Sequence, residues 1–179
     1  MDVGLDTGPT LAMLRTPIGP DETSAELFAR LSALGARLVR DALPQYLEGA
    51  LTPVPQDDSA ATLAPILTKE HARIDWKRTA QQIHNQVRGL QPWPGTSTTL
   101  GTRRLIVTQT RVDSPPTVLG GAPGEVVAVT KDAIWVATGA GLVAVTELQL
   151  EGKRRMHARE FLAGHPLRVG AFLGVEVLP

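Results

Sequence analysis

The sequence predicts an α+β protein in which a loop, a strand and a long helix precede a proline-rich linker and a β-rich C-terminal region. Three observations predict this organisation. Apolar residues recur at three- and four-residue spacing from Leu27 to Leu43, the period of an amphipathic helix. Prolines and polar residues crowd residues 51–67, a composition typical of an extended linker. Beyond residue 100, short β-rich runs are split by glycine and aspartate turns, which is typical of a small closed or nearly closed barrel.

The chain opens on a glycine-flanked loop, residues 3–9, that carries Asp6. Glycine permits positive φ and close backbone approach to a ligand, so this loop can expose an acid at the edge of a site. A catalytic acid also needs a pocket and partners, and only five residues precede Asp6. The sequence therefore predicts the rear part of a larger protein.

Residues 11–18 favour a short strand that ends at the turn between Pro17 and Pro20. Thr23 or Ser24 can cap the helix after this turn, and Glu26 stands at capping-box spacing from Thr23. The apolar stripe of this helix must be covered by a second layer, which one short strand cannot supply.

After the linker, the segment from Thr68 to Trp76 alternates so that Ile74 and Trp76 can dock on the β-rich region while Asp75 stays solvated or caps the next helix. A second helix is predicted from Thr79 to Leu90. Trp93, between two prolines, is predicted to be a packing anchor, with a stacking platform for a nucleotide as the alternative. Alternation then predicts strands, with a helical turn at residues 157–163, over residues 104–112, 125–129, 133–138, 142–148 and 170–178.

Composition excludes some kinds of site and partner. The chain has 179 residues, no cysteine and four histidines without i, i+4 pairing, so a thiolate zinc site is excluded and we expect no metal. Eighteen basic and eighteen acidic residues balance, so the chain is not a polycation. Neither a membrane span nor a signal peptide is visible, and a cytoplasmic location is expected by default.

The tripeptide Asp6-Thr7-Gly8 has three interpretations. It can be an ordinary turn, which is common for such tripeptides. It can be one half of an aspartic protease dyad, but the chain has no second copy and the long helix after it is foreign to a small β-rich protease. The third interpretation, a catalytic loop of a larger enzyme, depends on the downstream sequence.

Six blocks occur in order along the chain. They are Val3-Gly4-Leu5-Asp6-Thr7-Gly8-Pro9, Asp21-Glu22-Thr23-Ser24, Pro53-Val54-Pro55-Gln56-Asp57, Leu67-Thr68-Lys69-Glu70-His71-Ala72-Arg73-Ile74-Asp75-Trp76, Gln91-Pro92-Trp93-Pro94-Gly95 and Leu150-Glu151-Gly152-Lys153-Arg154-Arg155-Met156. Their order and spacing resemble methionyl-tRNA formyltransferase, from late in its catalytic domain to its C-terminus, and they cover essentially the whole chain.

The resemblance implies a strand-helix remnant of a Rossmann-like formyltransferase domain at residues 1–50, a linker at 51–67 and an OB-like tRNA-binding β-barrel at 68–179. It implies formyl transfer from formyl-tetrahydrofolate to the amino group of initiator methionyl-tRNA, with no DNA or membrane partner. Asp6 matches the family's catalytic aspartate, and Val3, Gly4 and Leu5 match a loop near the pterin of the co-substrate.

The family supplies an asparagine and a histidine from a stretch ahead of its aspartate, and nothing in the 179 residues matches them. We therefore expect this chain alone to be catalytically incompetent. A non-enzymatic RNA-binding module is the alternative function. Under either function, the residues expected to contact tRNA phosphates are Arg103, Arg104, Lys153, Arg154, Arg155 and Arg159.

Overall fold

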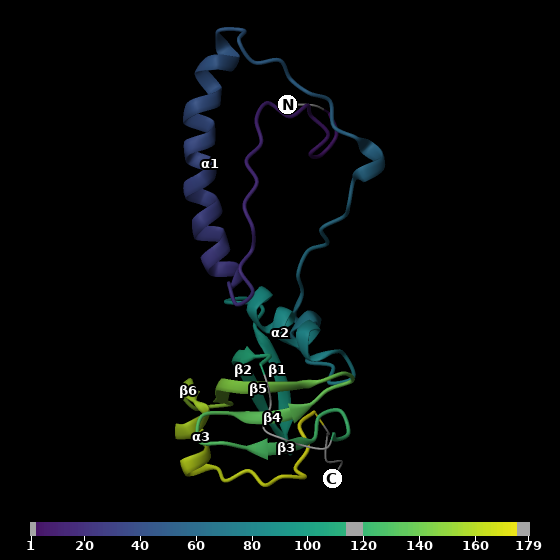
Figure 1. Cartoon of the computed structure of the whole chain (residues 1–179), viewed down its shortest axis with the longest axis vertical. Helices are drawn as coiled ribbons and strands as arrows, with labels where there is room; N and C mark the ends of the chain where they lie inside the picture. Colours follow the sequence, from purple (N-terminus) through teal and green to yellow (C-terminus); the bar gives the residue numbers. More distant parts are fainter. Residues whose placement is uncertain (1–2, 114–119, 175–179) are drawn as a thin grey trace. The chain divides into compact units, whose positions relative to one another are not determined.

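The computed structural model describes residues 3–113 and 120–174 (Figure 1). The chain divides into two compact units, residues 1–66 and residues 67–179. Helices and one antiparallel sheet make up the described residues, as the α+β prediction requires. The finer division into remnant, linker and barrel stays a prediction.

The first unit is dominated by one long helix, α1 (Ser24–Leu47). Thr23 caps it: the backbone N–H of Glu26 donates to Thr23 Oγ1 at 3.3 Å, and the backbone N–H of Thr23 donates to Glu26 Oε2 at 2.8 Å. This reciprocal pair satisfies donors that a helix start leaves free, so the predicted capping box is confirmed.

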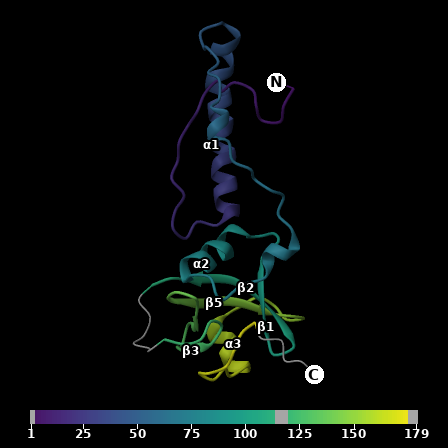
Figure 2. The same ribbon diagram turned by 90° about the vertical axis from the view of Figure 1, so that its right-hand side faces the viewer.

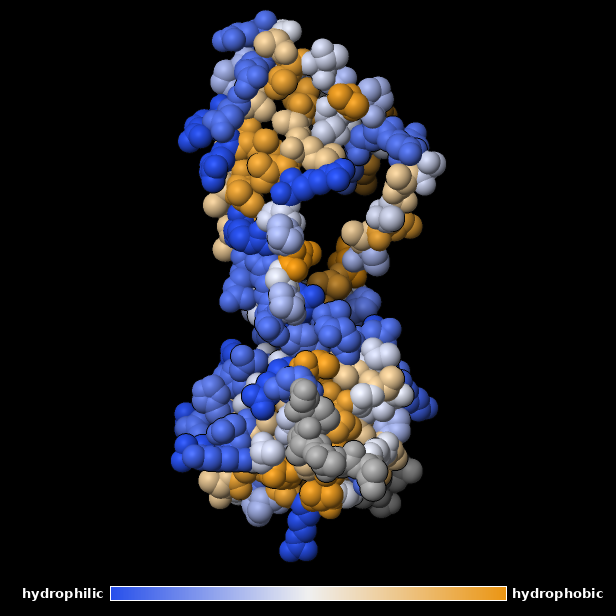
Figure 3. All heavy atoms as spheres, in the orientation of Figure 1, coloured by the Kyte–Doolittle hydropathy of each residue, from blue (hydrophilic) through white to orange (hydrophobic). Residues whose placement is uncertain are grey.

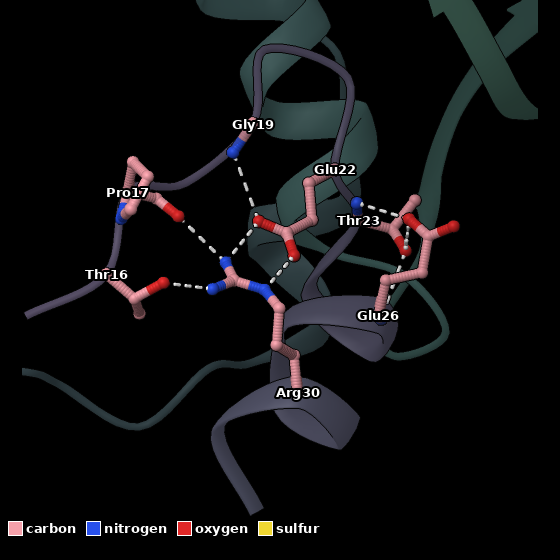
Figure 4. Close-up of polar contacts among 7 residues, drawn as sticks. All are labelled: Thr16, Pro17, Gly19, Glu22, Thr23, Glu26 and Arg30. Carbon is pink, nitrogen blue, oxygen red and sulfur yellow. Dashed lines mark hydrogen bonds and ion pairs between the residues drawn. The ribbon is translucent and has the colours of Figure 1, made fainter. Parts of the chain in front are cut away.

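The loop ahead of α1 is clamped by Arg30 (Figure 4). Its Nε and Nη2 donate to the two carboxylate oxygens of Glu22, each at 2.8 Å. Nη2 also donates to the carbonyl of Pro17 at 2.8 Å, and Nη1 donates to Thr16 Oγ1. One side chain of α1 therefore holds both ends of the turn that leads into the helix.

The strand predicted over residues 11–18 is wrong. Among the described residues of this unit, only Thr10 pairs in strand fashion, with Val54, through bonds of 2.8 and 2.9 Å. A strand needs a neighbour for its backbone N–H and C=O groups, and no segment pairs with residues 11–18 in strand fashion in the described structure. The segment 51–67 is also more structured than predicted, because it supplies Val54 and a 3-10 turn, η1 (Asp58–Ala60).

No described residue of this unit is buried. The stripe of α1 is correctly predicted as amphipathic, yet Phe28 is 77% exposed. Hydrophobic side chains therefore lie at the surface of residues 3–66 (orange in Figure 3).

The second unit is a six-stranded antiparallel sheet with short helices. Its elements are η2 (Lys69–Ala72), α2 (Ala80–Gly89), β1 (Thr96–Leu100), β2 (Arg103–Arg111), β3 (Val126–Val129), β4 (Ile134–Ala137), β5 (Leu142–Leu150), β6 (Met156–His157) and α3 (Ala158–Gly164). The strand order is β1-β2-β5-β4-β3, and β6 pairs with β5. Figure 2 shows α2 lying across β2 and β5.

A large buried core holds this unit together, and a second, smaller cluster forms around Trp135. Ile83 and Val87 of α2 and Phe161 of α3 join buried residues of β2, β4 and β5, among them Leu105, Val136 and Leu148. Ile74 and Trp76 are buried in the same core while Asp75 is exposed, so the predicted docking of this segment is confirmed. Thr79 caps α2 through a second capping box with Gln82.

The bounds of α2, β2, β3, β4, β5 and α3 agree with the predicted elements within about two residues. Strand β1 was missed, because Thr96-Ser97-Thr98-Thr99 offers no alternation of apolar residues. Its β-branched threonines were the available signal. The strand predicted over 170–178 lies partly outside the described residues. Within them, Gly174 donates to the carbonyl of Thr99 and Leu173 donates to the carbonyl of Gly124.

The packing role predicted for Trp93 is wrong, because its side chain is 56% exposed. The neighbouring Leu90 is buried instead and accepts a backbone bond from Gly95 at 2.8 Å. Leu90 thus takes the apolar contact at this turn, and Trp93 faces outward.

Candidate functional site

The Asp6 loop is held by a residue from the predicted linker. Gln56 Nε2 donates to the carbonyl of Asp6 at 2.8 Å and to the carbonyl of Gly8 at 2.7 Å. The Thr10–Val54 pairing lies directly beside these bonds along both segments. The structure thereby ties the loop at residues 3–9 to residues 54–56, more than forty positions away. Sequence reasoning missed Gln56, although it lies within one of the six blocks.

Asp6 itself has φ of 57°, in the left-handed region. Aspartate tolerates this region better than most residues do, at a cost of roughly 1–2 kcal/mol. Gly4 lies close to Thr7, because a Cβ at this position would lie 2.6 Å from Thr7 Oγ1. The loop therefore has a defined turn that leaves Asp6 exposed.

Val3 and Leu5 flank this turn and are almost fully exposed, Leu5 at 95%. The structure thus presents all four predicted residues of the loop, Val3, Gly4, Leu5 and Asp6, on the first unit.

The predicted basic residues lie on the second unit, where strand pairing joins two groups that are far apart in sequence. Leu105 of β2 pairs with Leu150 of β5. The backbone N–H of Glu151 donates to the carbonyl of Arg104 at 3.0 Å, and Arg103 Nη2 donates to the carbonyl of Glu151 at 3.0 Å. Arg103 and Arg104 therefore lie beside the turn that continues into Lys153.

Two members of the basic group are paired with carboxylates. Arg155 Nε and Nη2 donate to the two oxygens of Glu147 at 2.7 and 2.5 Å, and the hydrogen bond to Glu147 raises the pKa of Arg155. Arg154 Nη2 donates to Glu160 Oε1 at 3.1 Å. This bond, followed by the backbone N–H of His157, lowers the pKa of Glu160. The positive charge of the group is thus partly neutralised, and Lys153 and Arg159 are exposed beside it.

A cavity of about 320 Å³ lies beside Arg104 and Glu151. It is lined by Arg104 together with Lys69 and Arg73. Sequence reasoning assigned no contact to Lys69 or Arg73, although both lie in the fourth of the six blocks. Only the pairing of β1 with the segment around Arg73 shows that they approach Arg104.

Two broader findings concern residues 3–113 and 120–174. No group of three histidine, aspartate or glutamate side chains is placed to hold a metal ion there. None of the helices in these ranges combines the length and apolar character needed to cross a membrane.

Curated proteins with related sequences are named methionyl-tRNA formyltransferase. The chain is 45% identical over 174 residues to that of Sorangium cellulosum, covering 97% of this chain and 56% of the relative. It is 47% identical over 171 residues to that of Myxococcus xanthus, covering 96% of this chain and 54% of the relative. The chain spans about half the length of these relatives.

Solved structures share the fold at low identity. HypX from Aquifex aeolicus in complex with tetrahydrofolic acid matches with a TM-score of 0.64 at 19% identity, covering 98% of this chain and 32% of that one. An N-formyltransferase from Helicobacter canadensis, in complex with folinic acid and dTDP-3-aminofucose, matches with a TM-score of 0.60 at 15% identity, covering 81% of this chain and 52% of that one.

The family match falls on the unit that contains the sheet. Residues 66–166 match the family described as "Formyl transferase, C-terminal domain", which is more than half of the chain. The chain belongs to the formyl transferase family, and these residues are its C-terminal domain.

Proposed function

We propose that this chain is part of a methionyl-tRNA formyltransferase, which transfers a formyl group from formyl-tetrahydrofolate to the amino group of methionine on initiator tRNA. The observation that carries the proposal is the 45–47% identity to relatives of that name, which extends over both units. Because the chain spans about half the length of these relatives, it contributes a part of the enzyme.

In this proposal Asp6 is the catalytic carboxylate. Attack of an amine on a formamide passes through a tetrahedral intermediate that carries an oxyanion and an ammonium. A carboxylate can relay the ammonium proton, while neutral donors stabilise the oxyanion. The exposed turn held by Gln56 supports the proton-relay role, since it presents the acid to a substrate.

Residues 3–5 are proposed to lie near the pterin of formyl-tetrahydrofolate, with no metal in the reaction. The glycine at position 4 supports close approach of a ligand to the backbone. A structure of similar fold was solved with tetrahydrofolic acid, which is consistent with this co-substrate class. The remnant of a Rossmann-like domain is proposed for residues 1–50, and residues 51–67 join it to the tRNA-binding part. A cytoplasmic site of action is proposed with the function.

Residues 68–179 are proposed to form an OB-like barrel that holds the tRNA. The segment 170–174 supports closure of the sheet, because it bonds to both ends of the strand order. Leu173 pairs with Leu100 at the end of β1, and Gly170 donates to the carbonyl of Val126 at the start of β3. Arg103, Arg104, Lys153, Arg154, Arg155 and Arg159 would contact phosphates and position the tRNA.

The alternative, a non-enzymatic RNA-binding module, needs only the second unit. It offers no role for the Asp6 turn, which Gln56 and the Thr10–Val54 pairing hold in one conformation. The relatives that match both units are named as enzymes, which favours the formyltransferase.

The proposal is tested with the purified 179-residue chain and initiator methionyl-tRNA. We expect binding in a filter assay and no formylation of the methionine when formyl-tetrahydrofolate is added. Formylation would contradict the expectation that the chain lacks the asparagine and histidine that this family supplies ahead of its aspartate. Absence of tRNA binding at low salt would contradict the role of the second unit.

A further inference from the structure

The cavity that contains Arg104 has walls from four parts of the second unit. It is lined by Lys69, Arg73, Ile74, Ser97, Thr98, Thr99, Thr102, Arg104, Glu151 and Gly174. Its volume is about 320 Å³. We call it the Arg73 pocket.

The lining of the Arg73 pocket is strongly donor-rich. Three cationic side chains, Lys69, Arg73 and Arg104, and one carboxylate, Glu151, are among its lining residues. The hydroxyls of Ser97 and Thr102 add donors that can turn toward an anion, whereas Thr98 Oγ1 is bonded to Trp76 in the core. An oxyanion with several acceptor atoms suits this set better than a cation or an apolar ligand does.

The wall formed by β1 is rigid. Trp76 Nε1 donates to Thr98 Oγ1 at 3.0 Å in the buried core. Gly174 donates to the carbonyl of Thr99 at 2.9 Å, and its φ is 82°. A Cβ at Gly174 would lie 2.9 Å from Trp76 Cδ1 and 3.3 Å from Thr98 Oγ1, so only glycine allows this close approach.

The backbone that carries Arg73 is held as firmly. Gln86 Nε2, from α2, donates to the carbonyls of His71 at 2.8 Å and Arg73 at 3.0 Å. The backbone N–H of Ile74 donates to the carbonyl of Ser97 at 2.9 Å. The base of the Arg73 side chain is therefore placed against β1 before any ligand arrives, which lowers the entropy cost of binding.

We propose that the Arg73 pocket binds a phosphate group, with Arg73 and Arg104 as its charged contacts and Lys69 beside them. Arginine matches phosphate because its planar fork can donate two parallel hydrogen bonds. The inference deepens the proposed function and rests on it only for the source of the phosphate. That source is the tRNA backbone, and a small phosphorylated compound would offer the same chemistry.

The test begins with inorganic phosphate and the full chain. Amide resonances are followed by NMR as sodium phosphate replaces sodium chloride at constant ionic strength. We expect saturable shifts at Ser97, Thr98 and Thr99. Arg73→Gln and Arg104→Gln should each weaken this binding at least fivefold, while Arg168→Gln, an exposed arginine outside the lining, should leave it unchanged. Unperturbed resonances elsewhere would show that the variants remain folded.

A second arm identifies the source. If tRNA supplies the phosphate, Arg73→Gln lowers tRNA affinity several-fold and inorganic phosphate competes with tRNA. Phosphate binding that is lost in both variants, with unchanged tRNA affinity, supports the pocket and assigns it to a small phosphorylated compound. Absence of localised shifts, or shifts that survive both substitutions, overturns the pocket even where tRNA still binds. Phosphate binding without any tRNA binding upholds the pocket and contradicts the proposed function.

Discussion

The two units of this chain use the same local devices and differ in what surrounds them. Helix α1 in residues 3–66 and helix α2 in residues 67–174 both start at a threonine with a complete capping box. In the second unit, α2 buries Ile83 and Val87 in a shared core, whereas α1 buries no residue. Capping and amphipathic spacing therefore form a helix in either setting, while stability depends on a second apolar layer.

The largest difference in the free energy of unfolding is expected between the alanine variants of two phenylalanines. Phe161 is fully buried, so Phe161→Ala removes packed apolar surface and should lower the free energy of unfolding of the second unit by about 3–5 kcal/mol. Phe28→Ala, at an exposed position of α1, should change it by less than about 0.5 kcal/mol. Urea unfolding followed by the fluorescence of the buried Trp76 and Trp135 measures both. Equal effects would show that the core is not confined to residues 67–174.

Deletion of residues 1–50 should raise the soluble yield of the remaining chain. The reason is that exposed apolar side chains of α1, such as Phe28 and Leu47, favour association. Soluble protein after expression at a fixed temperature is compared with that of the whole chain. The double substitution Phe28→Gln and Leu47→Gln serves as a control that keeps the helix and should raise the yield in the same direction. A fall in soluble yield for the deletion would contradict the claim that the apolar side chains of α1 are exposed.

Substitutions in the two units should differ in their effect on tRNA binding. Neutralising Lys153, Arg154 and Arg155 should weaken tRNA binding about tenfold and flatten the salt slope by about 1–2, because fewer counterions are released. Asp6→Asn should leave tRNA affinity unchanged. A filter-binding titration at several salt concentrations measures both. Lys131→Gln, at an exposed turn, is the control for loss of a surface charge. An unchanged salt slope in the triple variant would remove this surface from the tRNA site.

Removing the N-cap of each helix tests whether the stability of that helix contributes to the unfolding free energy of the second unit. Thr79→Ala should cost about 1 kcal/mol in the unfolding of the second unit, because α2 is part of its core. Thr23→Ala loses the same kind of bond, yet it should only reduce the helicity of α1 and leave the second unit's midpoint unchanged. Circular dichroism and tryptophan fluorescence, recorded together, distinguish the two results. A shifted midpoint in Thr23→Ala would show that the units are energetically coupled.

The smallest effect concerns pH. The backbone N–H of Thr23, and then its hydroxyl, lower the pKa of Glu26 below the ordinary value of 4.5. A lowered folded pKa contributes stability that is present above pH 4.5 and is lost as the pH falls through the folded value. The first turn of α1 should therefore fray on acidification, which amide exchange detects. In Glu26→Gln, whose amide oxygen still accepts the bond from Thr23, this fraying should no longer depend on pH, and persistence of the dependence would implicate another acid.

Local patterns predicted much of the fold. The capping box at Thr23 and the stripe of α1 depend on neighbours within about ten residues, and the alternation of Ile74 and Trp76 around Asp75 is as local, so a sequence displays all three patterns directly. The strand predicted over residues 11–18 failed for the opposite reason, since a strand exists only where another segment pairs with it. Strand β1 was missed because its threonines are polar in the sequence, although Thr98 is buried and accepts a hydrogen bond from Trp76.

The candidate site shows the same division. Residue types and block order sufficed for the formyl transferase family, because these follow from chemistry and spacing along the chain, while the roles of the Asp6 loop and of the basic residues stay predictions. Tertiary structure alone decided that Gln56 holds the Asp6 turn, that Glu147 pairs with Arg155 and that Arg73 approaches Arg104. The physical reason is that strand pairing and core burial decide which segments meet. Gln56 lies 50 positions from Asp6, and Glu147 meets Arg155, eight positions away, only where β6 pairs with β5.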